Sequence, residues 1–337
     1  MKRLAIFAGY DKDNIIDDYV VYYIKELKKI ADIIYVSDCD ILESELTKIS
    51  EYCIHMINGR HEEYDFGSYK RGYLYAKENN ILQNYDYLIL CNDSCYGPFF
   101  NFQEIVENME NKNTDVWGIF KYLKDNKVDE HLQSYFLLIK QKVFLSDWYN
   151  KFILSIKKEE NKNDIIKKYE MGMSILFKNN NCSISSFLDS SFIENPSNNS
   201  IPSVYALEAI SYGFPLLKIA IFGEPTFFFF NVEKIQKIFK IIKPYDKNII
   251  INHLNRTMKK ENIKYLFPKF KTKQIHIFSK RFINISFQYS VSGRFQIAFS
   301  LFSKLKITID FPKSISYIDY KYKDFNFLLS DKINKKQ

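Results

Sequence analysis

The chain has 337 residues, of which 46% are hydrophobic and 17% aromatic, and its formal net charge is +8. This length accommodates two domains and this composition supplies a packed core, so an intrinsically disordered protein is excluded. The five cysteines are an odd number without zinc-like spacing, which indicates reduced thiols in a cytoplasmic protein.

No segment has the length of a membrane anchor. The apolar run at the start of the chain stops at Asp11-Lys12-Asp13, too early for a signal peptide. No other apolar run approaches the roughly 18 residues of a membrane span. We therefore expect a cytoplasmic protein that does not cross a membrane.

The first 190 residues alternate strand and helix signals. Apolar runs that end in polar residues predict strands over 4–8, 33–36, 53–57 and 87–91. Helical periodicity between them predicts helices over 15–30 and 42–50. A third helix follows Asp65 and is predicted over 73–79, continuing to about residue 80. Strands separated by helices favour an α/β fold, in which a mostly parallel sheet has right-handed crossovers.

The pattern changes after Pro98. Periodicity predicts helices over 102–109, 143–156 and 164–177, and strands over 116–120 and 131–139. The polar cluster from Asn195 to Ser200 interrupts the pattern and predicts the end of the first domain.

The strand over 87–91 ends at Asn92-Asp93-Ser94. Its uninterrupted apolar sequence is typical of a parallel strand buried on both faces. In open α/β sheets, ligands bind in the crevice at the carboxyl ends of the strands. Asp93 is therefore a candidate site residue on position alone.

The preceding helix adds a second polar group. We expect Asp65 to cap this helix, and Gly67 and Gly72 to leave room for a ligand or a neighbouring backbone. Lys70 and Arg71 then place positive charge near the crevice. The alternative is a capped surface helix whose charges are solvated.

The positive charge of the chain is concentrated near its carboxyl end. From Arg256 to Lys306 there are 12 Lys and Arg against one acid, which leaves −3 for the remainder. Aromatic residues interleave with these cations: Phe267, Phe270, Phe278, Phe282, Phe287, Phe295, Phe299 and Phe302. This pattern suits anionic lipid headgroups with aromatic insertion. A basic outer face over core Phe residues is the alternative, and no motif for nucleic acid accompanies the charge.

Across roughly residues 4–190 the chain carries, in order, the segments IFAGYDKDNIIDDYVVYYIKELKKIADIIYVSDCD, YDFGSYKRG, YDYLILCNDSCYGPF, DVWGI, HLQSYFLLIKQKVF and YEMG. These segments resemble the rhamnan synthesis protein F family of polysaccharide-building glycosyltransferases, most specifically in DFGSYKRG and CNDSCYGP. The resemblance extends more weakly to residues 195–196 and 213–218.

The resemblance implies a GT-A-like, Rossmann-like fold, in which a mostly parallel sheet is flanked by helices and followed by a smaller C-terminal helical or mixed extension. We expect a nucleotide-sugar-binding catalytic domain over residues 1–195 and a helical acceptor-side extension over 196–262. The basic, Phe-rich segment over 263–337 would then associate with the membrane.

The resemblance also implies a donor site. Tyr10, Asp11 and Asp38 would lie where this fold holds the base and ribose of the nucleotide. Asp65 and Lys70 would lie beside the diphosphate, near Gly67 and Arg71. Asn92 would also contact the donor, and the loop under the donor sugar would run over residues 94–97, with Ser94, Tyr96 and Gly97.

Asp93 occupies the place of the metal-binding D-x-D motif of such enzymes, but Asn92-Asp93-Ser94 has one carboxylate only. Mg²⁺ or Mn²⁺ can be held by one or two carboxylates together with substrate phosphates and water. A divalent metal at Asp93 is thus one expectation. The other is a metal-independent enzyme in which Lys70 and Arg71 offset the charge of the leaving diphosphate.

An inverting transfer needs a general base for the acceptor hydroxyl. By resemblance, Glu170 is the candidate and Asp164 its rival, while a solvated helix carboxylate is the alternative reading of Glu170. His131 is either a second base or an ordinary strand-edge residue.

Polar residues at the start of the strand over 131–139 are candidates for the acceptor pocket: Gln133, Ser134 and Tyr135. Trp117 and Gly118 would offer a stacking surface for a sugar ring, unless Trp117 is a buried core residue.

These features predict a glycosyltransferase that moves a sugar, by resemblance L-rhamnose or another deoxysugar, from a nucleotide-diphosphate donor to a lipid-linked glycan of a surface polysaccharide such as capsule or lipopolysaccharide. The enzyme would lie at the inner leaflet of the cytoplasmic membrane. A catalytically inactive nucleotide-sugar-binding or assembly subunit is the alternative. A nucleic-acid partner is disfavoured, because the polar cluster at the strand end lies far in sequence from the basic segment.

Overall fold

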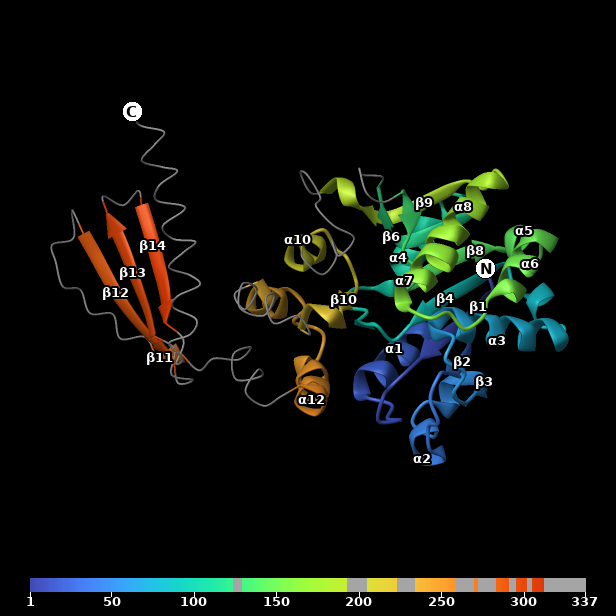
Figure 1. Cartoon of the computed structure of the whole chain (residues 1–337), viewed down its shortest axis with the longest axis horizontal. Helices are drawn as coiled ribbons and strands as arrows, with labels where there is room; N and C mark the ends of the chain where they lie inside the picture. Colours follow the sequence, from blue (N-terminus) through green and yellow to red (C-terminus); the bar gives the residue numbers. More distant parts are fainter. Residues whose placement is uncertain are drawn as a thin grey trace. The chain divides into compact units, whose positions relative to one another are not determined.

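The computed structural model describes residues 1–123, 129–192, 205–222 and 234–258, and the backbone of strands at 270–271, 283–290, 295–301 and 305–311 (Figure 1). The chain forms two compact units, Met1–Thr257 and Met258–Gln337. Within the described residues, no helix is long and apolar enough to span a bilayer.

The described part of the first unit is built on an eight-stranded sheet. Its strands lie side by side in the order β3 (Cys53–Ile57), β2 (Asp32–Ser37), β1 (Arg3–Gly9), β4 (Tyr87–Asn92), β8 (Phe136–Lys140), β6 (Val116–Tyr122) and β7 (His131–Leu132), and β9 (Ile184–Asp189) pairs with β6. The strands β3, β2, β1 and β4 pair in parallel, which confirms the predicted parallel sheet. By contrast, β8 runs antiparallel to both β4 and β6.

This strand order creates a crevice. From β1 the chain builds outward through β2 and β3 on one side, and then returns to place β4 on the other side of β1. The loops after β1 and β4 therefore leave the same sheet edge in opposite directions, which is the usual ligand-binding position of such sheets. Every residue of β1 and β4 is buried, as expected for central strands.

Helices cover both faces of the sheet (Figure 1). On one face, Tyr69 and Tyr73 join the core cluster that contains Ile6 of β1. On the other face, the ring of Phe7 lies 5.3 Å from that of Tyr23. The helices of this unit include α1 (Asp18–Lys28), α2 (Glu43–Leu46), α3 (Tyr64–Glu78), α4 (Phe102–Glu110), α5 (Gln141–Phe144), α6 (Asp147–Ser155), α7 (Lys162–Ile165) and α8 (Gly172–Asn179).

The strand predicted over 131–139 is interrupted. Leu132 pairs with Lys121 of β6, and Leu137 pairs with Gly118, so four residues of this strand stand opposite two of β6. The interruption is a bulge, a feature that redirects side chains and is frequent beside active sites. It separates β7 from β8 and places residues 133–135 at the carboxyl edge of β4.

Two predicted helices are also divided. The helix predicted over 143–156 becomes α5 and α6, because Ser146 accepts the backbone N–H of Tyr149 and starts a new helix. The helix predicted over 164–177 contains a π-helical turn, Ile166–Met171, between α7 and α8. Such turns are rare and frequently lie at functional sites.

The segment that follows residue 205 is part of the first unit. It contributes α10 (Ala206–Ser211), α12 (Lys247–Thr257) and β10 (Leu217–Lys218), which pairs with β5 (Cys95–Tyr96). The compact units divide after Thr257. The domain boundary expected at 195/196 stays a prediction, because residues 193–204 lie outside the described part.

The second unit contains an antiparallel sheet in the order β11 (Phe270–Lys271), β12 (Ile283–Ser290), β13 (Phe295–Leu301) and β14 (Leu305–Phe311). The side chains of these strands lie outside the described residues. The predicted membrane contact of the basic, Phe-rich segment therefore stays a prediction.

Candidate functional site

Two adjoining pockets open at the carboxyl edge of the parallel strands. The first, here the Asp93 pocket, has a volume of about 500 Å³ and is lined by residues that include Tyr10, Asp38, Arg60, Asp93 and Lys158. The second, here the Glu170 pocket, has a volume of about 310 Å³ and is lined by residues that include Asn92, His131, Gln133, Ser134, Tyr135, Glu170 and Lys218. Both pockets share Tyr64, Asp65, Ser94 and Lys162.

Asp93 joins the ends of the two strands that flank the crevice. Its Oδ2 accepts the backbone N–H of Tyr10, 2.7 Å away, and its carbonyl accepts the hydroxyl of Tyr19 at 3.1 Å. Burial raises the pKa of Asp93 well above its usual range, and the nearby carboxylates of Asp65 and Asp11 raise it further. The site thus disfavours a bare negative charge here and favours a cation or proton beside it.

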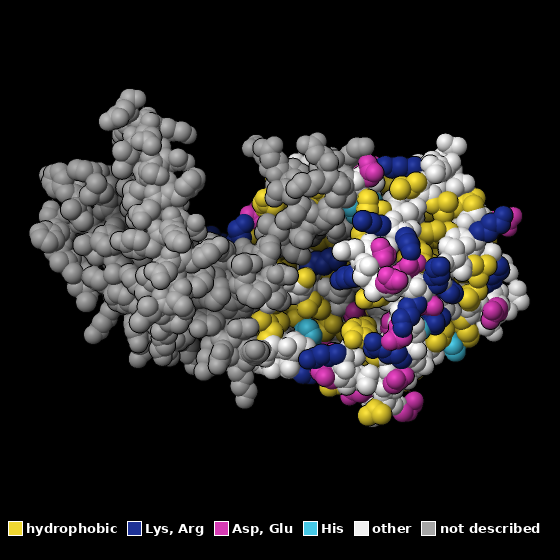
Figure 2. Space-filling view, viewed as in Figure 1, with side chains coloured by type: hydrophobic (Ala, Val, Ile, Leu, Met, Phe, Trp, Pro, Cys, Tyr) yellow, Lys and Arg dark blue, Asp and Glu magenta, His cyan; other side chains and the backbone are white. Residues whose placement is uncertain are grey.

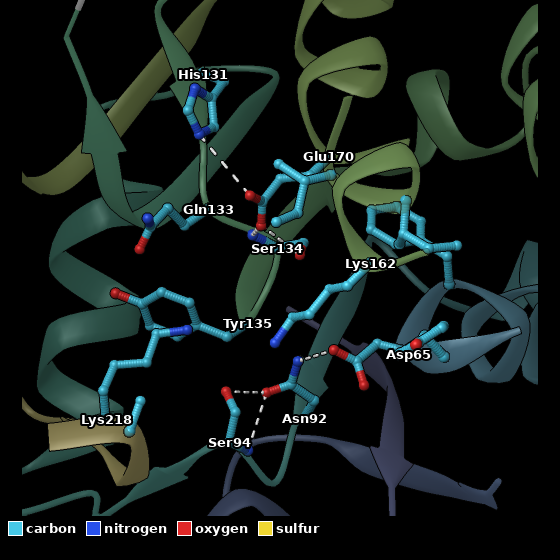
Figure 3. Close-up of a pocket in the computed structure, with 15 residues that line it drawn as sticks. Asp65, Asn92, Ser94, His131, Gln133, Ser134, Tyr135, Lys162, Glu170 and Lys218 are labelled. Atoms are coloured by element: carbon cyan, nitrogen blue, oxygen red, sulfur yellow. Dashed lines mark hydrogen bonds and ion pairs between the residues drawn. The ribbon is translucent and has the colours of Figure 1, made fainter. Parts of the chain in front are cut away.

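Asp65, Asn92 and Ser94 form a chain of hydrogen bonds between the pockets (Figure 3). The Asn92 Nδ2 donates to Asp65 Oδ2 at 2.7 Å, and the Ser94 hydroxyl donates to Asn92 Oδ1 at 2.7 Å. Burial raises the pKa of Asp65, while Lys218 and Lys162 oppose that shift. The expected capping role of Asp65 is wrong, because α3 starts after Glu63 without a side-chain cap.

Glu170 projects from the π-helical turn into its pocket (Figure 3). Its Oε2 accepts both the backbone N–H of Ser134 at 2.8 Å and the Ser134 hydroxyl at 2.7 Å. The carbonyl of Ser134 in turn accepts the hydroxyl of Tyr69 at 3.0 Å. The bulge and the π turn therefore fix each other, so Glu170 is not a solvated helix carboxylate.

His131 faces the second oxygen of Glu170. Its Nδ1 lies 2.8 Å from the carbonyl oxygen of Asp129, and a carbonyl only accepts, so Nδ1 carries the proton. This leaves Nε2 directed at Glu170 Oε1, 3.8 Å away. His131 is buried and is thus part of the pocket wall.

The outer wall of the Asp93 pocket is formed by the loop after β3. Asp38 Oδ1 accepts the backbone N–H groups of His61 and Glu62, each at 2.7 Å, which fixes this loop. The guanidinium of Arg60 lies 5.5 Å from the ring centre of Tyr10, and the Tyr10 side chain is 47% exposed. A planar ring beside a cation can stack against a nucleobase.

Lys70 and Arg71 line neither pocket. The Lys70 ammonium donates to the carbonyl of Ile156 at 2.6 Å, and the Arg71 guanidinium donates to Glu63 Oε2 at 2.7 Å. Glu63 also lies 3.7 Å from the Lys70 ammonium. Both side chains are thus engaged by protein groups and line neither pocket, so this placement does not support the expected contact with a diphosphate.

Three further candidates line neither pocket because the protein itself occupies their surroundings. The Asp11 carboxylate is paired with Arg256 at 2.5 Å. Tyr96 is buried and its hydroxyl lies 2.5 Å from Nδ1 of His253. A Cβ on Gly97 would lie 2.5 Å from the carbonyl oxygen of Pro215, so this glycine serves a close approach of two backbones.

The glycines of α3 also face protein atoms. A Cβ on Gly67 would lie 2.8 Å from the ring of His61, and one on Gly72 would lie 2.5 Å from Ile6. These glycines let α3 pack closely on its neighbours. They leave no room for a ligand.

Trp117 and Gly118 lie in the core of the sheet. Trp117 is 1% exposed, and its ring lies 5.6 Å from that of Phe136. A Cβ on Gly118 would lie 3.1 Å from Leu132 and Leu137. The expected stacking surface for a sugar is therefore wrong, because strand pairing buries Trp117 within the protein.

The structure adds cations that the sequence patterns did not single out: Arg60, Lys158, Lys162 and Lys218. Arg60 follows a predicted strand end and could have been found by the argument that selected Asp93. Lys158 and Lys162 belong to a mixed-charge stretch that is typical of a solvated surface. Lys218 joins the site only because β10 pairs with β5.

The carboxylates fit a divalent cation in part. Among the described residues, no three His, Cys, Asp or Glu side chains form a metal-binding cluster. Asp65 and Asp93 both border the Asp93 pocket, and each has a raised pKa that a cation would lower. Mg²⁺ is commonly held by one or two carboxylates with phosphate oxygens and water, which this arrangement can provide.

The family described as rhamnan synthesis protein F matches residues 33–289 of the chain. This range is well over half of the sequence, and the chain belongs to the rhamnan synthesis protein F family. The resemblance predicted from the sequence motifs is confirmed.

Two curated relatives match part of the chain. The uncharacterized protein y4gN of Sinorhizobium fredii is 26% identical over 177 residues, which cover 52% of this chain and 45% of that protein. Virulence protein VirA of Vibrio anguillarum is 28% identical over 203 residues, which cover 57% of this chain and 63% of that protein. The chain thus spans less than two thirds of the length of these relatives.

Two solved structures show a distant likeness. Core-mannan synthase A from Aspergillus fumigatus, in a Mn/GDP form, has a TM-score of 0.34 and 10% identity, covering 52% of this chain and 69% of that chain. A mannosyltransferase from S. cerevisiae in complex with GDP has a TM-score of 0.32 and 8% identity, covering 45% and 60%. Likeness at this level does not extend to individual site residues.

Proposed function

We propose that this protein is a glycosyltransferase of polysaccharide synthesis that uses a nucleoside-diphosphate sugar as donor. The observation that carries this proposal is the pair of adjoining pockets at the strand-order crevice, one bordered by Asp93 and the other by Glu170. A donor that spans them would place its nucleoside in the Asp93 pocket and its sugar in the Glu170 pocket. Membership of the rhamnan synthesis protein F family supports this reading.

Glu170 is the general base of the proposed reaction. Its Oε2 is held by both donors of Ser134, so its Oε1 remains to accept a proton from the acceptor hydroxyl. The oxygen of the acceptor hydroxyl then attacks the anomeric carbon of the sugar as the bond to the diphosphate breaks, and the anomeric configuration inverts. Asp164, the rival base, lines neither pocket and is hydrogen-bonded to Asn161.

Asp93 and Asp65 are the residues that would hold a divalent cation. Such a cation, when bound, would neutralise charge on the diphosphate. The two carboxylates would then serve as ligands in their ionised form, despite pKa values that burial raises in the free protein.

The proposed donor sugar is L-rhamnose or another deoxysugar, and the proposed acceptor is a lipid-linked glycan at the inner leaflet. Two features support these finer assignments. The family is named for rhamnan synthesis, and the basic, Phe-rich segment near the carboxyl end suits an anionic lipid surface.

Calorimetric titration with a panel of nucleoside diphosphates, with and without Mg²⁺ or Mn²⁺, tests the donor site. We expect one diphosphate to bind selectively, more tightly with metal, and Asp93→Asn to weaken the metal-dependent part. Asp86→Asn, at the opposite end of β4 and exposed, is the matched control. The proposal fails if no nucleoside diphosphate binds.

A catalytically inactive nucleotide-sugar-binding subunit remains a second candidate. It is favoured by the single carboxylate of Asn92-Asp93-Ser94. It predicts selective donor binding without turnover when acceptor is present, and product analysis of a donor–acceptor mixture separates it from the enzyme.

A further inference from the structure

The charged groups that line the Glu170 pocket differ in the partners that the described residues give them. Its two carboxylates have donors, since Asp65 is bound by Asn92 and Glu170 by Ser134. Its two ammonium groups have no carboxylate within 4.0 Å among the described residues: these are Lys162 and Lys218. Within the described residues, the pocket therefore contains two carboxylates held by neutral hydrogen-bond donors and two ammonium groups without a close ion pair.

The two lysines approach from different elements. Lys162 begins α7 and extends toward Asp65 and Asn92, while Lys218 extends from β10 on the opposite side (Figure 3). Their ammonium groups point toward one another across the pocket (Figure 3). Both also act on the Asp65 carboxyl, whose pKa they lower against the effect of burial. An anion between them would thus meet a cation on each side.

Lys218 is held firmly at this position. Its strand pairs with β5, where Lys218 stands opposite Cys95, and the next residue, Ile219, donates its backbone N–H to the carbonyl of Ser94 at 2.9 Å. The Lys218 ammonium lies 3.9 Å from the ring centre of Tyr135. The backbone and the ring together orient a cation that has no ion-pair partner within the described residues, which is a preorganised arrangement for binding an anion.

We propose that Lys162 and Lys218 form an anion site for the phosphate groups of a substrate, in place of Lys70 and Arg71. This assignment deepens the proposed function and rests on it for the identity of the substrate. Lys162 borders both pockets, so a diphosphate at their junction would contact Lys162. Lys218 borders the Glu170 pocket and would contact the same diphosphate from the side on which the sugar lies. The phosphate can belong to the nucleotide donor or to a lipid-linked acceptor, and the two sources share this chemistry.

Substitution by Met tests the site, because Met keeps the unbranched stem on the Tyr135 ring and removes the charge. Titration of the full chain with inorganic pyrophosphate is expected to show binding that weakens about tenfold in Lys162→Met and in Lys218→Met. Lys218→Arg is expected to restore it. Lys77→Met, an exposed position on α3, is the matched control and is expected to match the wild type.

Three further titrations distinguish the sources of the phosphate. If the phosphate belongs to the donor, Lys218→Met is expected to weaken binding of the best nucleoside diphosphate and to leave binding of the corresponding nucleoside unchanged. If the phosphate belongs to the acceptor, Lys218→Met is expected to weaken binding of a water-soluble short-chain prenyl phosphate and to leave binding of the nucleoside diphosphate unchanged. Equal loss for the nucleoside, or a lower melting temperature that accounts for the loss, would show a structural role and overturn the assignment.

The anion site and the proposed function can fail separately. Pyrophosphate binding that depends on the two lysines, without preference for any nucleoside diphosphate, would support the proposed anion site and contradict the proposed glycosyltransferase function. Binding of all these phosphates that is unaffected by both Met variants, or lost in Lys70→Met instead, would overturn the anion site and leave the glycosyltransferase standing. A wild type that binds no pyrophosphate also overturns it.

Discussion

At the scale of single residues, position in the chain was a sufficient guide for some side chains and not for others. Asp93 follows a buried strand, and that alone places it at the crevice. Lys70 lies on the adjacent helix and was expected beside it, but its direction on the helix takes it to Ile156. Direction depends on how α3 packs, which the local sequence does not specify.

Replacement of Glu170 by Gln is predicted to lower the turnover number by about 10²- to 10⁴-fold while donor affinity stays near that of the wild type. The amide cannot accept the proton of the acceptor hydroxyl, yet its oxygen still accepts from Ser134. Steady-state kinetics together with donor titration measure both quantities. Asp164→Asn should remain active, and the roles of the two residues are reversed if it is the variant that loses turnover.

Asp93→Asn is predicted to stabilise the ligand-free protein at neutral pH. Because burial raises the pKa of Asp93, the folded state holds its proton to higher pH than the unfolded state does, and stability falls as the pH rises above the ordinary aspartate range. Asn carries no such penalty. The melting temperature should exceed that of the wild type by about 2–4 °C at pH 7 and converge with it near pH 4.

Thermal unfolding from pH 4 to 8 without metal or nucleotide measures this difference. Asp86→Asn is the control and should follow the wild type. A difference in melting temperature that is the same at every pH would show that the ionisation of Asp93 is not its cause.

At the scale of elements, distant segments complete the site by pairing with the loop after β4. The carbonyl of Pro215 accepts the backbone N–H of Phe99 at 2.9 Å, and β10 continues this contact to Lys218. The loop that carries Asp93 and Ser94 is therefore positioned from both sides. This long-range pairing brings Lys218 into a pocket that is lined mainly by residues earlier in the chain.

Gly97→Ala is predicted to lower the free energy of unfolding more than Gly213→Ala does. Both glycines have positive φ, at 123° and 82°, so each substitution strains the backbone by about 1–2 kcal/mol. Only Gly97 adds a contact of 2.5 Å with the Pro215 carbonyl, whereas Gly213 has nothing within 4 Å. Denaturant unfolding should show a larger loss for Gly97→Ala, accompanied by weaker pyrophosphate binding. Equal losses would contradict the close-contact explanation.

Arg256 anchors α12 to the loop after β1. Its guanidinium is paired with the carboxylates of Asp11, Asp13 and Asp17, and it is partly exposed. Arg256→Ala is predicted to lower the free energy of unfolding by about 2–3 kcal/mol, because three like charges lose their counter-ion. Urea denaturation measures the loss. It should shrink as the pH falls through the lowered pKa of Asp11, because that carboxyl then gains a proton and no longer needs a counter-ion. Lys247→Ala, exposed on the same helix, should have little effect.

At the scale of the whole molecule, positive charge is unevenly distributed. On the face of the described residues shown in Figure 2, Lys and Arg side chains are interspersed with Asp and Glu. The net positive charge instead belongs to the stretch from Arg256 to Lys306. A mixed-charge unit and a basic, Phe-rich stretch suit different partners, a small anionic ligand and an anionic surface respectively.

The full chain is predicted to sediment with vesicles that contain anionic lipid at low salt, and to be released at about 0.5 M salt, because screening shortens the reach of surface charge. Vesicles of neutral lipid are the control. The membrane proposal fails if lipid charge and salt make no difference to sedimentation.

The sequence by itself determined the α/β class, the parallel strands β1 to β4 and the position of Asp93, because hydrophobic runs and their polar ends are local signals. It also determined the family, through motifs that remain contiguous in the chain. The tertiary structure decided which helix faces meet the crevice, the bulge that presents Ser134 to Glu170, and the entry of Lys162 and Lys218. These depend on packing and on pairing between segments up to about 120 residues apart, as for Lys218 and Cys95, and no local pattern encodes such contacts.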